Sequence, residues 1–221
     1  MRLVIQALTS RYGKGFLFYR CAKVHSLLMR RKALDMTCKM TAACTLNIRW
    51  VTTWGRADEN ASWREGANNL KGMGEIDTSL NTGLAVGWQI TSWLSVEGKA
   101  TLPVTDSQGV NYQASVTLLP LQTSQDTIAF QSASLFGDSR YLNTWYGVSQ
   151  QQSQRSGYSR YSAPGGFYGI DSSLTWSHQF DTHWGTVLSA DYTWLGEHAN
   201  NSPIVSRRNE GAVTAAITWT F

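Results

Sequence analysis

Apolar and polar residues alternate along most of the chain beyond residue 46. The longest alternation runs from Ile76 to Ile90, where even positions carry larger or more apolar side chains than odd positions. Successive side chains of a β-strand point to opposite faces, so this pattern predicts one strand with a single apolar face. Its length of about fifteen residues exceeds the soluble mean of roughly five to six and the roughly 9 to 11 needed to cross a membrane.

Similar alternation recurs in seven other segments and predicts an all-β fold. The predicted membrane crossings are 47–55, 75–90, 93–103, 109–119, 126–136, 167–180, 183–195 and 211–221. About eight antiparallel strands favour a transmembrane β-barrel, and we expect roughly 8 to 12 strands in the intact barrel. No run approaches the roughly 18 consecutive apolar residues of a membrane-spanning helix, which excludes a helical membrane protein.

Aromatic residues support the barrel over a soluble sandwich. The chain holds 10 Trp, 9 Tyr and 7 Phe. Many lie near the ends of predicted strands, as the aromatic girdles of membrane barrels do: Trp88, Trp93, Trp176, Phe180, Trp184, Trp194 and Trp219. A soluble sandwich also shows alternation, but it does not need Trp at so many strand ends.

The direction of the strands predicts which connections lie outside the cell. If Phe221 lies on the periplasmic side, Asp181-Thr182 is a periplasmic turn and 196–209 is an outer loop. Residues 137–166 then form one long outer excursion. Within it, we interpret 141–149 as a strand that extends beyond the membrane.

Residues 1–48 differ from the rest of the chain. Residues 1–49 hold ten Lys and Arg against one acid, Asp35, a net charge of +9, whereas residues 50–221 carry −5. All three cysteines, Cys21, Cys38 and Cys44, lie in the same part. This part lacks the apolar core of a signal peptide and fits neither a helical nor an extended period. We therefore predict an atypical basic leader at 1–48, not native to the barrel, and a barrel domain at 49–221.

Two other interpretations of this leader stay open. Its basic cluster, Arg30-Arg31-Lys32 with Lys39, could bind nucleic acid or an anionic membrane. The sequence Thr41-Ala42-Ala43-Cys44 faintly resembles a lipoprotein cleavage box, but the segment before it is charged where a lipoprotein signal is apolar. A mis-set start or a frameshift accounts for the leader better, so we expect no nucleic-acid partner.

The last segment, 211–221, alternates between apolar odd positions and small or polar even positions. It ends on an aromatic residue and resembles the terminal strand of bacterial outer-membrane barrels, whose closing Phe belongs to the signal read by the insertion machinery. The resemblance implies that Trp219 and Phe221 form this signal. Taken alone, the segment also fits the edge strand of a soluble sheet.

Three motifs in the predicted loops resemble the MipA/OmpV family of outer-membrane proteins. One is Leu70–Asp77, which reads LKGMGEID, and another is NSPIV, which contains Ser202 and Pro203. The third is a spaced set: Tyr146, Gly147, Val148, Ser149, Arg155, Ser156, Gly157 and Tyr161. The resemblance covers about residues 49–221. Residues 1–48 do not match, because the family begins there with a signal peptide and further strands, so the chain looks truncated or altered at its front.

The resemblance implies an outer-membrane scaffold with no enzymatic activity and no cofactor. The family's named member binds the lytic transglycosylase MltA and a bifunctional penicillin-binding murein synthase, and so brings a murein hydrolase and a synthase together. These enzymes, with outer-membrane lipid and lipopolysaccharide, are the expected partners. Because the front of the family pattern is missing, a non-functional truncated fragment is a further alternative.

The residues also suggest two other functions. A hydrolytic site would use His178, Asp181 and His183 with a nearby Ser, but no G-x-S-x-G motif occurs and Asp181 lies in a predicted turn. We therefore predict no catalytic and no metal-binding residues. A surface-binding or adhesion protein, or a small pore, would use loop residues that can pair with lipopolysaccharide phosphates: Arg155, Tyr158, Arg160, Tyr161, Arg207 and Arg208. A barrel this small is filled by its own side chains, which disfavours a general porin.

Overall fold

The computed structural model describes residues 2–10, 36–39, 44–57, 68–105 and 108–220. These residues form a ten-stranded antiparallel sheet in the order β1-β10-β9-β8-β7-β6-β5-β4-β3-β2. Its strands are β1 (Arg2–Ser10), β2 (Met36–Lys39), β3 (Cys44–Thr53), β4 (Ser79–Gln89), β5 (Leu94–Pro103), β6 (Asn111–Gln122), β7 (Asp126–Gly137), β8 (Gly166–Gln179), β9 (Trp184–Leu195) and β10 (Asn209–Thr220).

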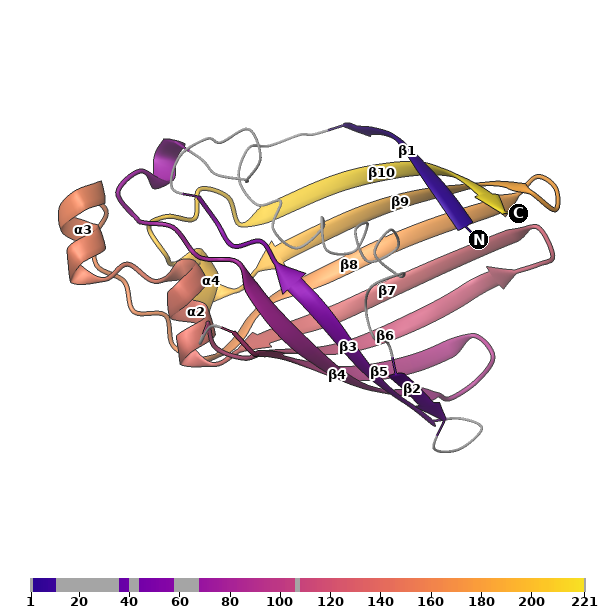
Figure 1. Ribbon diagram of the computed structural model, residues 1–221, viewed down its shortest axis with the longest axis horizontal. Helices are drawn as coiled ribbons and strands as arrows, with labels where there is room; N and C mark the ends of the chain where they lie inside the picture. Colours follow the sequence, from indigo (N-terminus) through magenta and orange to yellow (C-terminus); the bar gives the residue numbers. More distant parts are fainter. Residues whose placement is uncertain (1, 11–35, 40–43, 58–67, 106–107, 221) are drawn as a thin grey trace.

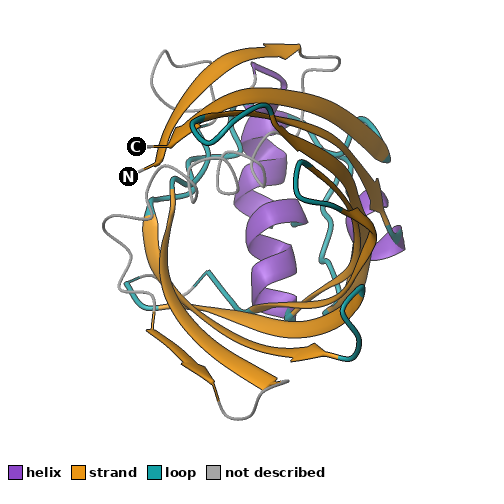
Figure 2. Ribbon diagram, turned by 90° about the vertical axis from the view of Figure 1, so that its right-hand side faces the viewer, coloured by secondary structure: helices purple, strands orange, loops and turns teal. Residues whose placement is uncertain are grey.

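The sheet curls into a barrel-like wall whose two edges are β1 and β2 (Figures 1 and 2). Within the described residues, no ladder joins these edges. β1 pairs with β10 and β2 pairs with β3, both in antiparallel register. The segment 1–48, which the sequence did not assign to the barrel, therefore contributes a strand at each edge.

The eight strands predicted from alternation are confirmed as β3 to β10, with small shifts at their ends. The largest shift is at β4, which begins at Ser79 rather than at residue 75. Gly72 and Gly74 have φ of 86° and 79°, a left-handed conformation that interrupts a strand. Ile76 instead pairs with Arg56 in an isolated bridge.

The apolar faces of the strands point outward. In β4, Leu84, Val86 and Trp88 are 41%, 52% and 61% exposed, whereas Ser79 and Asn81 on the other face are buried. The same outward exposure is found on the neighbouring strands at Val116, Leu174, Leu188, Val213 and Ile217. Lipid covers such a face in an outer-membrane barrel, where the interior is polar.

The chain reverses in two different ways at the two ends of the sheet. At the turn end, short turns at 90–93, 123–125 and 180–183 join β4 to β5, β6 to β7 and β8 to β9. At the loop end, longer connections contain η1 (Asn68–Leu70), α2 (Ser139–Tyr146), α3 (Gln150–Ser156) and α4 (Glu197–Asn200) (Figure 1). Among the described residues, no helix is long and apolar enough to cross a membrane.

Candidate functional site

The connection between β7 and β8 is helical where a strand extension was predicted. The Asp138 side chain accepts a hydrogen bond from the Tyr141 amide at 2.6 Å and so caps the first turn of α2. Leu142, Trp145 and Tyr146 share one buried face of this helix, at the helical spacing of three and four residues. The prediction of a strand at 141–149 is therefore wrong, because the apolar residues there follow a period of 3.6.

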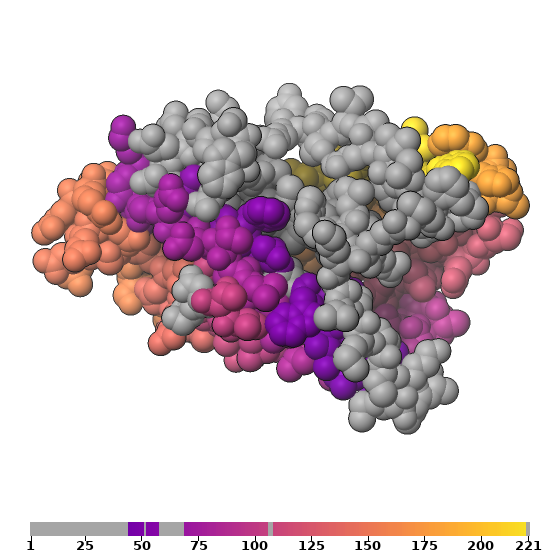
Figure 3. Space-filling model, viewed as in Figure 1, coloured from indigo at the N-terminus to yellow at the C-terminus, as the bar shows by residue number. Residues whose placement is uncertain are grey.

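A second helix, α3, follows after three residues. Ser149 and Gln152 form a reciprocal capping box at its start, and Gly157 ends it with φ of 79°. Between the helices, Val148 pairs with Tyr161 in an isolated antiparallel bridge. These local contacts fold 138–166 into a compact lobe, seen in orange at the left of Figure 3.

The three family motifs pack against one another at the loop end. The Gln152 side-chain amide donates to the Met73 carbonyl at 2.7 Å, which joins α3 to the 70–77 motif. The Ser202 hydroxyl donates to the Tyr146 carbonyl, which joins the 201–205 motif to α2. We call the assembly of residues 68–77, 138–166 and 196–208 the cap. Its three segments are far apart in sequence, yet the motifs that they carry belong to one folded unit.

The cap covers the loop end with a buried core. Leu142 and Ala199 are fully buried, and Tyr168 is 1% exposed, in a cluster that also contains Leu135 and Trp145. Tyr168 reaches this cluster through a β-bulge, since Phe136 pairs with Phe167 while Leu135 pairs with Gly169. Simple alternation would put Tyr168 on the same outward face as Ile170, which is 37% exposed, and the bulge turns Tyr168 inward instead.

The residues singled out from the family motifs occupy different layers of the cap. Tyr146, Val148 and Ser202 are buried, whereas Ser149, Arg155 and Gly157 lie at the surface. The remaining ones are at least partly covered: Gly147, Ser156, Tyr161 and Pro203. Gly147 ends α2 and donates its amide to the Asn143 carbonyl. Most of these motif positions therefore shape the cap, and Arg155 presents its side chain to solvent.

Further hydrogen bonds hold the cap together, and of the side chains named here that make them only Tyr161 belongs to the sequence motifs. Arg56 is 4% exposed, and its Nη1 donates to the Trp145 carbonyl at 3.2 Å. The Tyr161 hydroxyl donates to the His198 carbonyl at 3.0 Å and so connects the segment before β8 to α4. Asn143 donates to the Ala163 carbonyl at 2.8 Å and accepts from its amide at 3.0 Å. Charge and periodicity in the sequence do not indicate that Arg56 is buried, because its partner is the backbone carbonyl of a residue 89 positions away.

Burial also changes the acid–base properties of the cap. Desolvation raises the pKa of Tyr146 well above the ordinary tyrosine value, since a phenolate would lose its hydration there. Burial raises the pKa of Tyr161 in the same direction. Both side chains therefore stay neutral at physiological pH and serve the cap as packing and hydrogen-bonding groups.

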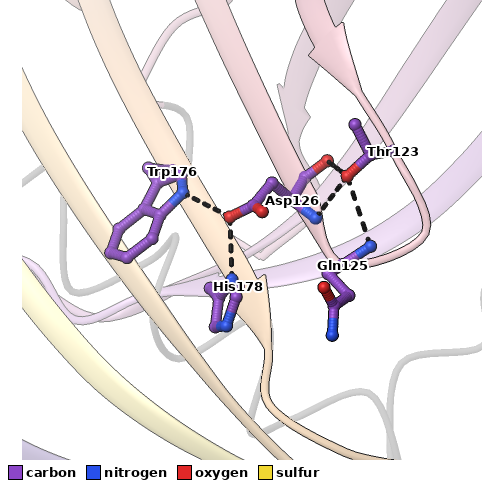
Figure 4. A network of polar contacts seen from close by, with 5 residues as sticks. All are labelled: Thr123, Gln125, Asp126, Trp176 and His178. Atoms are coloured by element: carbon purple, nitrogen blue, oxygen red, sulfur yellow. Dashed lines mark hydrogen bonds and ion pairs between the residues drawn. The ribbon is translucent and has the colours of Figure 1, made fainter.

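The turn end does not bring the hypothetical hydrolytic residues together as a triad. His178 contacts Asp126 instead of Asp181, with Nδ1 2.8 Å from Oδ1 (Figure 4). The Asp181 carboxylate accepts from the amides of His183 and Trp184, which closes the turn and lowers its pKa. His183 Nδ1 lies 4.0 Å from Asp181 and 2.9 Å from the Thr182 hydroxyl. Over the described part of the chain, no group of three His, Cys, Asp or Glu is arranged to hold a metal.

Trp219, one of the two residues of the predicted insertion signal, also lies at the turn end. Trp219 pairs with Trp184 across β10 and β9, with ring centroids 6.3 Å apart. Phe221 lies outside the described residues, so the insertion signal stays a prediction.

A family model described as MltA-interacting protein MipA matches residues 9–221. The chain belongs to the MipA family. The match starts well before residue 49, so it includes most of the segment that the sequence alone did not assign to the family. This extension agrees with the pairing of β2 and β3 ahead of the predicted domain start.

Two relatives of this MipA-family chain are named as outer membrane proteins. YiaT of Escherichia coli K12 is 27% identical over 157 residues, covering 70% of this chain and 63% of YiaT. Omp26La of Vibrio anguillarum is 27% identical over 164 residues, covering 72% of this chain and 60% of Omp26La. The chain thus spans less than two thirds of the length of these relatives. The family and these relatives support an outer-membrane β-barrel protein.

Among solved structures, the NanC porin aligns with 85% of this chain and 76% of its own, with 10% identity and a TM-score of 0.45.

Proposed function

We propose that this MipA-family protein is a non-enzymatic outer-membrane scaffold that holds murein enzymes at the periplasmic surface. The observation that carries the proposal is the filled loop end, where Leu142, Tyr146 and Tyr168 pack into one buried cluster. A packed core of this kind leaves little room for a solute path and suits a rigid support. The family description, MltA-interacting protein, supports a lytic transglycosylase as one partner.

The turn end is the surface that a periplasmic partner would meet. Long loops face outward and short turns face the periplasm in bacterial barrels. Here the turns at 90–93, 123–125 and 180–183 form that surface. A penicillin-binding murein synthase as second partner would place a hydrolase and a synthase on one support.

Site-specific crosslinking tests this proposal. A photoreactive residue at Thr182 is expected to capture the lytic transglycosylase or the murein synthase, whereas the same probe at Gln151 in α3 is not. Both positions are exposed, so the pair differs in the end of the barrel that it samples. Capture from Gln151 alone, or from neither position, would argue against a periplasmic scaffold.

Planar-bilayer conductance and hydrolase assays test the pore and enzyme alternatives. The filled cap predicts no stable channel for the folded protein. We also expect no protease or lipase activity. Stable single-channel steps would support the small-pore alternative instead.

A second candidate function is binding of lipopolysaccharide at the loop end. The Arg208 guanidinium lies 4.6 Å from the centroid of the Trp194 ring, and Arg208 is exposed. Its Nε also donates to the Leu195 carbonyl at 2.9 Å, which fixes the side chain. A fixed, exposed guanidinium suits phosphate recognition. R208Q is expected to weaken lipopolysaccharide retention, with R140Q on α2 as the matched control.

A further inference from the structure

A polar cluster lies on the outward face of the barrel at the turn end. Asp126 is the first residue of β7 and pairs in register with His178 of β8. The next outward pairs along the same ladder are Ile128 with Trp176 and Phe130 with Leu174. Phe130 and Leu174 are 38% and 50% exposed, so this column faces the lipid. Asp126 is thus a carboxylate at the turn-end boundary of the apolar belt.

One oxygen of this carboxylate receives two hydrogen bonds. Trp176 Nε1 donates to Oδ1 at 3.0 Å, and His178 Nδ1 lies 2.8 Å from the same atom (Figure 4). A carboxylate only accepts, so His178 carries its proton on Nδ1. Among the described residues, none donates a hydrogen bond to Oδ2. The Asp126 carboxylate supplies one negative charge to the cluster.

Aromatic rings surround this charge. The Trp176 and His178 rings stack with centroids 5.8 Å apart, and the Phe180 ring meets His178 edge-on at 4.8 Å. The side chains of His178 and Asp126 remain 24% and 32% exposed. A cation entering from the lipid side can therefore reach Oδ2 while its substituents lie against aromatic surface.

We propose that Asp126, His178 and Trp176 form a binding site for the ammonium group of an ethanolamine phospholipid in the periplasmic leaflet. The primary ammonium donates to Oδ2 of Asp126, and the acyl chains run along the outward column of β7 and β8. A carboxylate beside hydrocarbon is costly unless it is paired, and this occupant supplies the opposite charge. The site requires an inserted barrel, but it does not depend on any murein partner.

Lipid retention by the full-length folded protein tests this site. The protein is released from membranes in mild detergent and titrated with phosphatidylethanolamine, phosphatidylcholine or phosphatidylglycerol, and bound lipid is counted by native mass spectrometry. We expect phosphatidylethanolamine to be retained about fivefold better than the other two lipids, the size of an interfacial ion pair. Equal retention of all three would overturn the proposal. Retention of phosphatidylcholine as strong as that of phosphatidylethanolamine would also overturn it, because a quaternary ammonium has no N–H to donate.

Matched variants test whether the Asp126 carboxylate causes the preference for phosphatidylethanolamine. D126N keeps an oxygen that accepts from Trp176 and His178 but removes the charge, and we expect it to abolish the preference. D126E restores the charge and is expected to recover part of it. R140Q, on α2 at the other end of the barrel, should leave the preference unchanged. An unaltered preference in D126N would overturn the site.

A folding defect is separated from lipid loss by gel migration. Each variant is compared unboiled and boiled, since a folded barrel migrates differently before heating. If D126N does not fold, the three-lipid comparison on the unmodified protein decides the proposal.

Discussion

The turn end and the loop end reverse the same strands with different physical means. At the turn end, each reversal is made by neighbouring residues, as where Asp181 accepts from the amides two and three positions later. At the loop end, contacts join segments far apart in sequence, as between Gln152 and Met73 or Ser202 and Tyr146. The comparison teaches that the turns need only local chemistry, whereas the cap folds only when its separate segments meet. The two ends should therefore respond differently to substitution.

Removing a buried side chain from the cap should have the largest effect. L142A deletes most of a fully buried side chain, and such a change costs about 2–5 kcal/mol. The cap is expected to open to limited proteolysis while the strands keep their heat-modifiable migration. L174A removes the same atoms from a 50% exposed outward position and serves as the control. Equal protease sensitivity in both variants would contradict a separately packed cap.

A glycine at the foot of the cap should give the next effect. Gly109 has φ of 86°, and a Cβ there would lie 2.1 Å from the Tyr141 amide nitrogen. G109A therefore combines a strained backbone with a clash against α2, at a cost of about 1–3 kcal/mol or more. Gly157 has φ of 79° but no atom within 4 Å of its virtual Cβ. G157A should thus show only the conformational cost, and hydrogen exchange in α2 measures the difference.

The contrast between the ends also explains what sequence could predict. Alternation located β3 to β10 because an outward apolar face and an inward polar face impose a period of two. It cannot place Tyr168, because the bulge opposite Phe136 depends on a partner strand. It missed α2, although Asp138 and the spacing of Leu142, Trp145 and Tyr146 carried a helical signal.

The cap and the Asp126–His178 cluster also differ in how far the sequence predicts them. The family motifs identified pieces of the cap, but only folding shows that Gln152 reaches Met73. The pair of Asp126 with His178 joins residues 52 positions apart, and the sequence instead linked His178 with the nearby Asp181. Adjacency in sequence predicted the turn at Asp181 correctly but gave no indication of the Asp126–His178 hydrogen bond, since strand register decides which side chains meet.

A helix cap should give a smaller, local effect. S149A removes the hydroxyl that accepts from the Gln152 amide, and loss of such a cap costs about 1 kcal/mol. Gln152 also holds Met73, so exchange of amides in α3 and around residue 73 should rise together. S153A, in the middle of the same helix, is the control. Faster exchange confined to α3 would separate the capping box from the packing of the motifs.

The smallest effects should come from pH. Acid is expected to destabilise the turn end and alkali the loop end. Backbone amides lower the pKa of Asp181, so its stabilisation of the turn is present above the unfolded value and is lost as pH falls through the folded value. Burial raises the pKa of Tyr146, so its contribution is present below the ordinary tyrosine value and is lost as pH rises beyond it.

Acid should therefore speed amide exchange at His183 and Trp184 first, and alkali should speed it in α2 first. D181N should abolish the acid response alone and Y146F should reduce the alkaline response alone, because each removes the titrating group of one end. Loosening of both ends in one pH range would show that the cap and the turns open as a single unit.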